Sequence, residues 1–288
     1  MIDLGKSRSC STLTMDVIPC RGAKICSPFV AGDGCIHYVS AGTGEVFKYQ
    51  APDSHTPVVF SGGEPFGAQF DHRGRLHLAD CAHAAILRVD DTAQPGVMVK
   101  AYEERAFRGP NGIAFAQDDT LFFTDSGPLG ETTLEKPQGS VFCIASSPSG
   151  GQVLRPLVME CLAHPWGIAV SPDTGALFVA ETMKNRIVRL RQRPNNAYHT
   201  SIFHQFSGGM GPSGLACGAD GALYVGHYDF SGGGASNGKI SIIGLDGILK
   251  QTMEIPGTEI TGLCLSADES YVIVAEASTN TIHRLPIQ

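Results

Sequence analysis

Short apolar runs alternate with turns along the whole chain, and this alternation is organised into a repeat. Each repeat starts at a Pro-X-Gly corner, continues through an apolar run, a turn and a second apolar run, and ends on a polar residue. Apolar runs of this length, bounded by Gly and Pro, predict β-strands joined by tight turns. The corners with proline lie at 64–67, 109–112, 164–167 and 211–214, and a version without proline lies at 259–262.

The spacing of the corners gives the size of the repeat. The X residues stand at 66, 111, 166, 213 and 261, so the steps are 45, 55, 47 and 48 residues, in the range of propeller blades. Segment 34–40 aligns with 74–80 and adds a first unit that lacks the corner but has Cys26 at the X position. Six units account for the 288 residues, which predicts a single domain over 1–288.

Four short antiparallel strands per unit predict an all-β, six-bladed β-propeller. The last unit ends at 282–286 with no sequence left for its outermost strand, whereas the apolar segment 12–18 precedes the first unit and has no unit of its own. We therefore expect the N-terminal strand to complete the sixth blade and to cover its sheet edge.

Register in a propeller places two sets of side chains near one end of the axis. The polar residue that ends the second apolar run follows X by 14 or 15 positions, so the two should lie side by side. We expect a small-molecule pocket there, with the X residues and, from the second set, Asp80 and Glu181 in its wall. The inner set is Cys26, Phe66, Asn111, Trp166, Ser213 and Thr261, and the outer set is Ser40, Asp80, Asp125, Glu181, His227 and Glu276.

Composition narrows the classes of partner. The chain is 42% hydrophobic and 17% charged, with a net charge of −7 and no cluster of Lys and Arg, which argues against nucleic-acid binding. No apolar run reaches membrane-spanning length and the N-terminus lacks a signal-peptide pattern, so we expect a cytoplasmic protein with no membrane partner. The nine cysteines have no zinc-site spacing and are expected to be reduced.

Several polar residues of the two sets are candidates for chemistry. Asp80, Asp125, Glu181 and Glu276 could hold a cation or supply a general base with a raised pKa, or each could accept backbone N–H groups of a turn. Ser213 and His227 could form a nucleophile and base, with Glu181 or Glu276 as the orienting acid. The sequence around Ser213 is not a nucleophile elbow, so a structural hydrogen-bonded pair is the alternative.

Aromatic residues of the inner set suggest a further binding mode. Phe66 and Trp166 could clasp a cation or a flat ring at the axis. Alternatively, they could plug the axis, because a propeller of this size must fill its centre.

Three stretches resemble a known family. They are 109–115 with 122–125, the insertion 130–141, and 212–215 with 221–225. They are similar to the six-bladed calcium-dependent lactonase and phosphotriesterase propellers, in particular the senescence-marker-protein/gluconolactonase-like group. Segments 177–182 and 185–187 look more like strictosidine-synthase-type propellers and NHL repeats.

The resemblance implies a calcium site built from X residues. In that group a Glu from blade one, Asn from blades three and four and an Asp from blade five hold the ion. Asn111 matches the blade-three ligand, but Cys26, Trp166 and Ser213 replace the other three. Calcium needs several oxygen ligands, so the sequence argues against the family's site, while a divalent cation such as Ca²⁺ stays open as a cofactor.

Two functions follow as expectations. The resemblance implies a hydrolase of a small lactone, ester or phosphotriester-like substrate bound at the axis. Asn111 would position the substrate or a metal, and Asp125, His227 or Glu276 would act as base, with Ser213 as a further catalytic candidate. The alternative is a non-catalytic, NHL-like propeller whose top face binds a small ligand or a protein partner.

Overall fold

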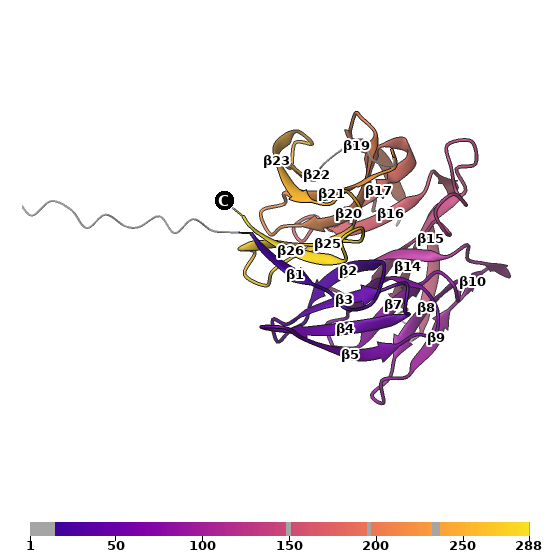
Figure 1. Ribbon diagram of the computed structural model, residues 1–288. Helices are drawn as coiled ribbons and strands as arrows, with labels where there is room; N and C mark the ends of the chain where they lie inside the picture. The colour runs from indigo at the N-terminus through magenta and orange to yellow at the C-terminus, as the bar shows by residue number, and fades with distance from the viewer. Residues whose placement is uncertain (1–14, 148–150, 195–196, 232–236, 288) are drawn as a thin grey trace, which may run out of the picture.

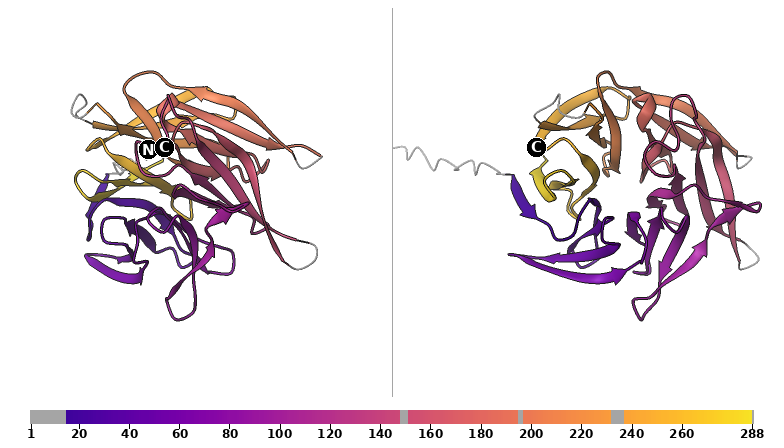
Figure 2. Two further views of the ribbon diagram at one scale, coloured as in Figure 1. Left: turned by 90° about the vertical axis from the view of Figure 1, so that its right-hand side faces the viewer. Right: turned by 45° about the vertical axis from the view of Figure 1, so that its right-hand side comes forward.

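Six four-stranded antiparallel sheets surround a common axis in the computed structural model, which describes residues 15–147, 151–194, 197–231 and 237–287 (Figure 1). The right-hand view of Figure 2 shows the sheets arranged as the blades of a ring. The predicted six-bladed propeller is therefore confirmed.

The first strand of blades two to six starts at the repeat corner, and the fourth strand of each blade lies outermost. Blades one and two comprise β2 (Ile25–Val30), β3 (Ile36–Ser40), β4 (Glu45–Gln50), β5 (Ser54–Phe60), β6 (Pro65–Phe70), β7 (Leu76–Asp80), β8 (Ala85–Val89) and β9 (Pro95–Val99). Blades three and four comprise β12 (Pro110–Phe115), β13 (Leu121–Asp125), β14 (Gly139–Ser146), β15 (Gln152–Leu162), β16 (Pro165–Val170), β17 (Leu177–Glu181), β18 (Arg186–Gln192) and β19 (Tyr198–Gln205). Blade five comprises β20 (Met210–Cys217), β21 (Leu223–Asp229), β22 (Asn237–Ile243) and β23 (Leu249–Pro256).

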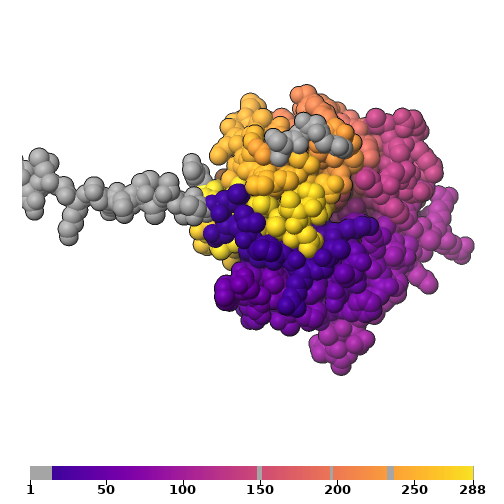
Figure 3. Space-filling model, in the orientation of Figure 1, coloured from indigo at the N-terminus to yellow at the C-terminus, as the bar shows by residue number. Residues whose placement is uncertain are grey.

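The sixth blade is completed by the other end of the chain. It contains β24 (Ile260–Leu265), β25 (Tyr271–Glu276) and β26 (Thr281–Pro286), and β1 (Asp16–Pro19) pairs antiparallel with β26. Figure 3 shows the N-terminal strand against the C-terminal part of the chain. The predicted closure is confirmed. The strand was expected over 12–18; its described part is Asp16–Pro19, and residues 1–14 lie outside the described residues.

A short hairpin and a short 3-10 turn lie outside the strands of the blades. A hairpin of β10 (Ala101–Tyr102) and β11 (Arg105–Ala106) joins blades two and three, and the short 3-10 turn η1 (Thr182–Lys184) follows β17. Within the described residues, no helix is long and apolar enough to cross a membrane.

The core consists of apolar layers between adjacent blades rather than one central cluster. Val39 and Val46 of blade one pack with Leu78 of blade two, for example, and Ile25 of blade one packs with Ile273 of blade six. Six such clusters follow the ring, one for each pair of neighbouring blades. Burial of these faces against each other holds the blades together.

The glycine of each corner explains why the repeat has this form. A Cβ on Gly67 would overlap the carbonyl oxygen of Asn111 in the next blade, and the same holds for Gly112 with Trp166 and Gly167 with Ser213. The inner strands therefore approach too closely for any side chain at this position. Blades five, six and one continue the pattern through contacts of Gly214 with Gly262 and of Gly262 with Ser27.

Blade one departs from this pattern. It carries Ser27 where the others have glycine, and Ser27 adopts a left-handed φ of 41°. Its hydroxyl accepts a hydrogen bond from the Ala68 N–H of blade two at 3.0 Å. A hydrogen bond thus replaces the close backbone approach between these two blades.

Gly167→Ala is expected to destabilise the fold, because its Cβ would meet the Ser213 backbone. The expected loss is about 1–3 kcal/mol, the usual cost of overpacking. Gly32→Ala is the matched control, since nothing lies near its Cβ and its φ is not left-handed. Chemical denaturation measures both variants. Equal stability of the two variants would contradict the close approach of the inner strands.

Candidate ligand site at the propeller axis

A channel of about 520 Å³ runs along the axis between the first strands of the blades. Four X residues contribute to its wall, namely Phe66, Asn111, Trp166 and Thr261. The wall continues along the strands to the turns that follow them, including residues 31–32 and 265–267. The channel thus extends from the X residues toward the opposite face, whereas the sequence placed the opening at the X residues themselves.

The remaining X residues do not line the channel, because their side chains link blades. Ser213 is fully buried and its Oγ donates to the carbonyl oxygens of Gly226 and, in the next blade, Ile260. The Cys26 thiol is also buried and donates weakly to the Pro65 carbonyl at 3.8 Å. These two members of the expected pocket are therefore structural links at the end of the channel.

Thr261 combines both roles. Its Oγ1 donates to the carbonyl oxygen of Ile25 at 2.6 Å, which joins blade six to blade one, and its side chain also reaches the channel. No local pattern predicted these links, although they account for small hydroxyl or thiol side chains at three of the six X positions.

Asn111 offers a polar atom that the fold does not use. Its side-chain Nδ2 donates to Ser126 Oγ at 3.4 Å, but its Oδ1 is buried and has no hydrogen-bond partner. A buried acceptor without a partner costs about 1–3 kcal/mol, so a donor from a bound molecule would be stabilised here. Among the X residues in the channel wall, Asn111 is therefore the polar anchor.

The aromatic members both fill and line the axis. Trp166 is only 7% exposed, and its ring lies 5.5 Å from that of Tyr228 and 5.6 Å from that of His164. Phe66 is partly buried against the apolar layer between blades one and two. Both side chains retain a surface in the channel and can contact the apolar part of a ligand.

The carboxylates of the outer set hold the chain where it enters each blade. Asp80 accepts the Glu64 N–H at 3.1 Å, Asp125 the Gly109 N–H at 2.8 Å, Glu181 the Ala163 N–H at 3.0 Å and Glu276 the Glu259 N–H at 3.0 Å. Each therefore ties the end of the second strand to the segment before the first. The structure places none of the four in the channel wall, including the expected wall residues Asp80 and Glu181.

Local partners also determine the charges of these groups. Glu181 is paired with Lys184 at 2.8 Å and with Arg186 at 2.6 Å. Burial raises the pKa of Asp125, and the Arg108 and Gly109 N–H groups partly oppose this. In the chain segments that the structure covers, no three His, Cys, Asp or Glu side chains converge as metal ligands.

His227 lies on the strand next to Ser213 in blade five, but its side chain bonds to a different residue. Its Nε2 is 2.9 Å from Ser241 Oγ, and its ring packs edge-on against Phe206. Burial lowers its pKa to about 3, so the imidazole is neutral near pH 7. The expected hydrogen bond with Ser213 is not formed, because the Ser213 hydroxyl donates to carbonyl oxygens instead.

Comparison with known proteins identifies the fold family. The family model described as SMP-30/Gluconolactonase/LRE-like region matches residues 30–278. The chain belongs to this family. A search of curated proteins gives no match.

Solved structures with a similar fold have low sequence identity to this chain. A gluconolactonase from Xanthomonas campestris is 19% identical with a TM-score of 0.79, over 95% of this chain and 89% of that one. A calcium-binding protein, regucalcin, from Agrobacterium tumefaciens is 16% identical with a TM-score of 0.75, over 93% and 91%. Virginiamycin B lyase from Staphylococcus aureus is 14% identical with a TM-score of 0.62, over 96% and 99%.

The calcium site implied by the family resemblance does not fit the residues present. At its four positions stand a buried thiol, an amide, an indole and a hydroxyl that already donates to two carbonyls. Burial raises the pKa of Cys26 well above its usual range, so the thiol is neutral. The four positions supply at most an amide and a hydroxyl oxygen and no carboxylate, whereas calcium takes six to eight oxygen ligands, usually with carboxylate charge.

Millimolar calcium is expected to leave the melting temperature of the protein unchanged, because an ion that binds the folded state must stabilise it. Differential scanning fluorimetry with calcium, and with magnesium at the same ionic strength as a control, makes the measurement. A rise in the melting temperature with calcium alone would show that the folded protein binds calcium.

Ser213→Ala is expected to lower the free energy of unfolding by about 1–3 kcal/mol, because two buried carbonyl groups lose their donor. Ser54→Ala, on the exposed edge strand of blade one, is the control.

A fluorophosphonate reagent is expected to leave Ser213 unmodified, as mass spectrometry can determine. Labelling of Ser213 would instead identify an activated nucleophile.

Proposed function

We propose that this propeller is a gluconolactonase-like hydrolase of a small lactone or ester that binds in the axial channel, with a degenerate metal site. Family membership supports the reaction class. The single observation that supports the site is the buried, unpartnered Oδ1 of Asn111 in the wall of that channel.

The channel has the properties of a site for a small neutral molecule. Its volume of about 520 Å³ lies in the usual range for small-molecule pockets. In the proposal, Asn111 Oδ1 accepts a hydrogen bond from a substrate hydroxyl or from the water that attacks the carbonyl. Phe66 and Trp166 cover the apolar part of the substrate and exclude bulk water.

The bases proposed from the sequence do not take part in this arrangement. Asp125, His227 and Glu276 each bind groups within their own blade and lie outside the channel wall. Catalysis would therefore rest on positioning and on the enclosed surroundings, which predicts a slow hydrolase. No step is assigned to a metal, because the donor set does not fit calcium.

A second candidate is a non-catalytic propeller that binds the same class of small molecule. The observation that favours it is the full engagement of Ser213, Asp125, Glu181 and Glu276 in structural contacts. Ligand binding through Asn111 is common to both candidates, so turnover alone separates them.

Asn111→Ala is the test of the axial site. Hydrolysis of a panel of lactones and esters is measured with a pH-stat. We expect turnover by the wild type and a rate roughly tenfold lower in the variant, as for removal of a polar contact to bound substrate. The exposed Asn237→Ala is the control.

Binding of the same compounds, measured by calorimetry, completes this test. Binding that depends on Asn111 without turnover would replace the hydrolase by the non-catalytic candidate. Turnover that is equal in the wild type and in Asn111→Ala would exclude the axial site.

A further inference from the structure

A second and larger cavity lies away from the axis, between blades three and four. Its volume is about 960 Å³. Its wall comes from β12 to β15 on one side and from β16, the turn after it, β18 and β19 on the other, with His72 of blade two. Phe115 and Val170 line both this cavity and the axial channel, so the two are neighbours. We call this cavity the interblade groove.

The floor of the interblade groove is apolar. Phe122 and Cys143 belong to the buried layer between the two blades, and Leu157 and Val170 pack against that layer. Such a surface favours the hydrocarbon or aromatic part of a ligand.

Two donors in the groove wall have no partner among the residues that the structure describes. Neither the guanidinium of Arg155 nor the hydroxyl of Tyr198 forms a hydrogen bond or ion pair with any of them. Arg155 stands opposite Cys143 in the register of β14 and β15. Burial raises the pKa of Tyr198, and the positive charge of Arg155 partly opposes this shift. The hydroxyl is therefore protonated near pH 7, and Tyr198 and Arg155 line the same groove.

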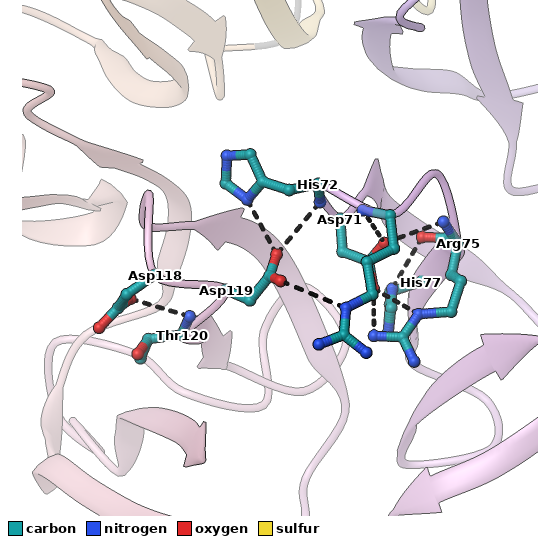
Figure 4. Close-up of polar contacts among 8 residues, drawn as sticks. Asp71, His72, Arg75, His77, Asp118, Asp119 and Thr120 are labelled. Atoms are coloured by element: carbon teal, nitrogen blue, oxygen red, sulfur yellow. Dashed lines mark hydrogen bonds and ion pairs between the residues drawn. The ribbon is translucent and has the colours of Figure 1, made fainter.

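Two further titratable residues, His72 and Asp118, line the groove. His72 Nδ1 is 2.8 Å from Asp119 Oδ1, so this histidine already has an acidic partner (Figure 4). Asp118 accepts the Thr120 N–H through Oδ1 at 3.0 Å, which leaves its second oxygen available to a donor (Figure 4). The groove thus combines an unpaired guanidinium, a hydroxyl donor and a carboxylate acceptor above an apolar floor.

We propose that the interblade groove binds a small hydroxycarboxylic acid with an apolar body. The ligand carboxylate would contact Arg155 and Tyr198, its hydroxyl would donate to Asp118, and its apolar part would rest on Phe122 and Leu157. Arg and carboxylate form charge-assisted hydrogen bonds, which are among the stronger polar contacts in proteins. The negative charge of Asp118 disfavours a ligand of higher negative charge, such as inorganic phosphate.

This inference does not rest on the proposed hydrolysis. Opening of a lactone by water nevertheless gives a molecule of the same class, since the carbonyl carbon becomes a carboxylate and the ring oxygen a hydroxyl. A hydrolase with such a groove beside its channel would bind its own type of product.

The test is calorimetric titration of the full-length protein with phenyllactate, which carries a carboxylate, an adjacent hydroxyl and a phenyl ring. Saturable binding is expected, weakened roughly tenfold or more by Arg155→Gln and less by Arg155→Lys. Tyr198→Phe is expected to weaken binding several-fold. Arg88→Gln, on the exposed face of β8, is the matched control and is expected to bind like the wild type.

Other outcomes would overturn the proposal. Binding that is equal in the wild type and in Arg155→Gln, with both melting alike, would place the ligand elsewhere. Displacement of phenyllactate by an equal concentration of inorganic phosphate would show a general anion site, and absence of binding in the wild type would exclude the ligand class. Asn111→Ala is expected to retain phenyllactate binding, which separates this groove from the axial site.

Discussion

The close approach of the six inner strands is the constraint on which the rest of this structure depends. At the corners of blades two to six the backbone of one blade lies so near the next that only glycine fits. This contact fixes the distance of every blade from the axis and the register of its first strand. The position before the glycine then projects its side chain toward the centre, where a ligand or a structural link can be built.

The same constraint explains why the inner side chains differ so strongly from those that the family resemblance implies. Three of the six X positions carry a hydroxyl or a thiol that donates to the carbonyl of the next blade, which adds a polar link to the apolar layers. A hydroxyl or thiol in such a link supplies none of the carboxylate charge that calcium usually requires. Two further positions hold aromatic rings, so among the six X residues Asn111 is the one with a buried side-chain oxygen that has no hydrogen-bond partner.

The family fold thus persists here while its metal chemistry does not fit. Relatives of 16–19% identity share the propeller over at least nine-tenths of this chain, but conserved architecture follows from glycine corners and apolar layers. A site depends on a few side chains that can change without disturbing either. The polar atoms of the channel and of the interblade groove therefore determine which ligand each can bind. The two cavities are chemically different environments on one scaffold.

The sequence by itself determined the repeat, the number of blades and the closure by the N-terminal strand, because alternating apolar runs and glycine corners are local signals. Register also placed Asn111 in the inner set, together with the five other X residues. Only the tertiary structure decided which polar residues are free, since hydrogen-bond partners come from other blades. Ser213 donates to Ile260, far along the chain, and Arg155 faces a groove whose other wall comes from the next blade. Such partnerships arise from packing across the ring, and no local pattern encodes them.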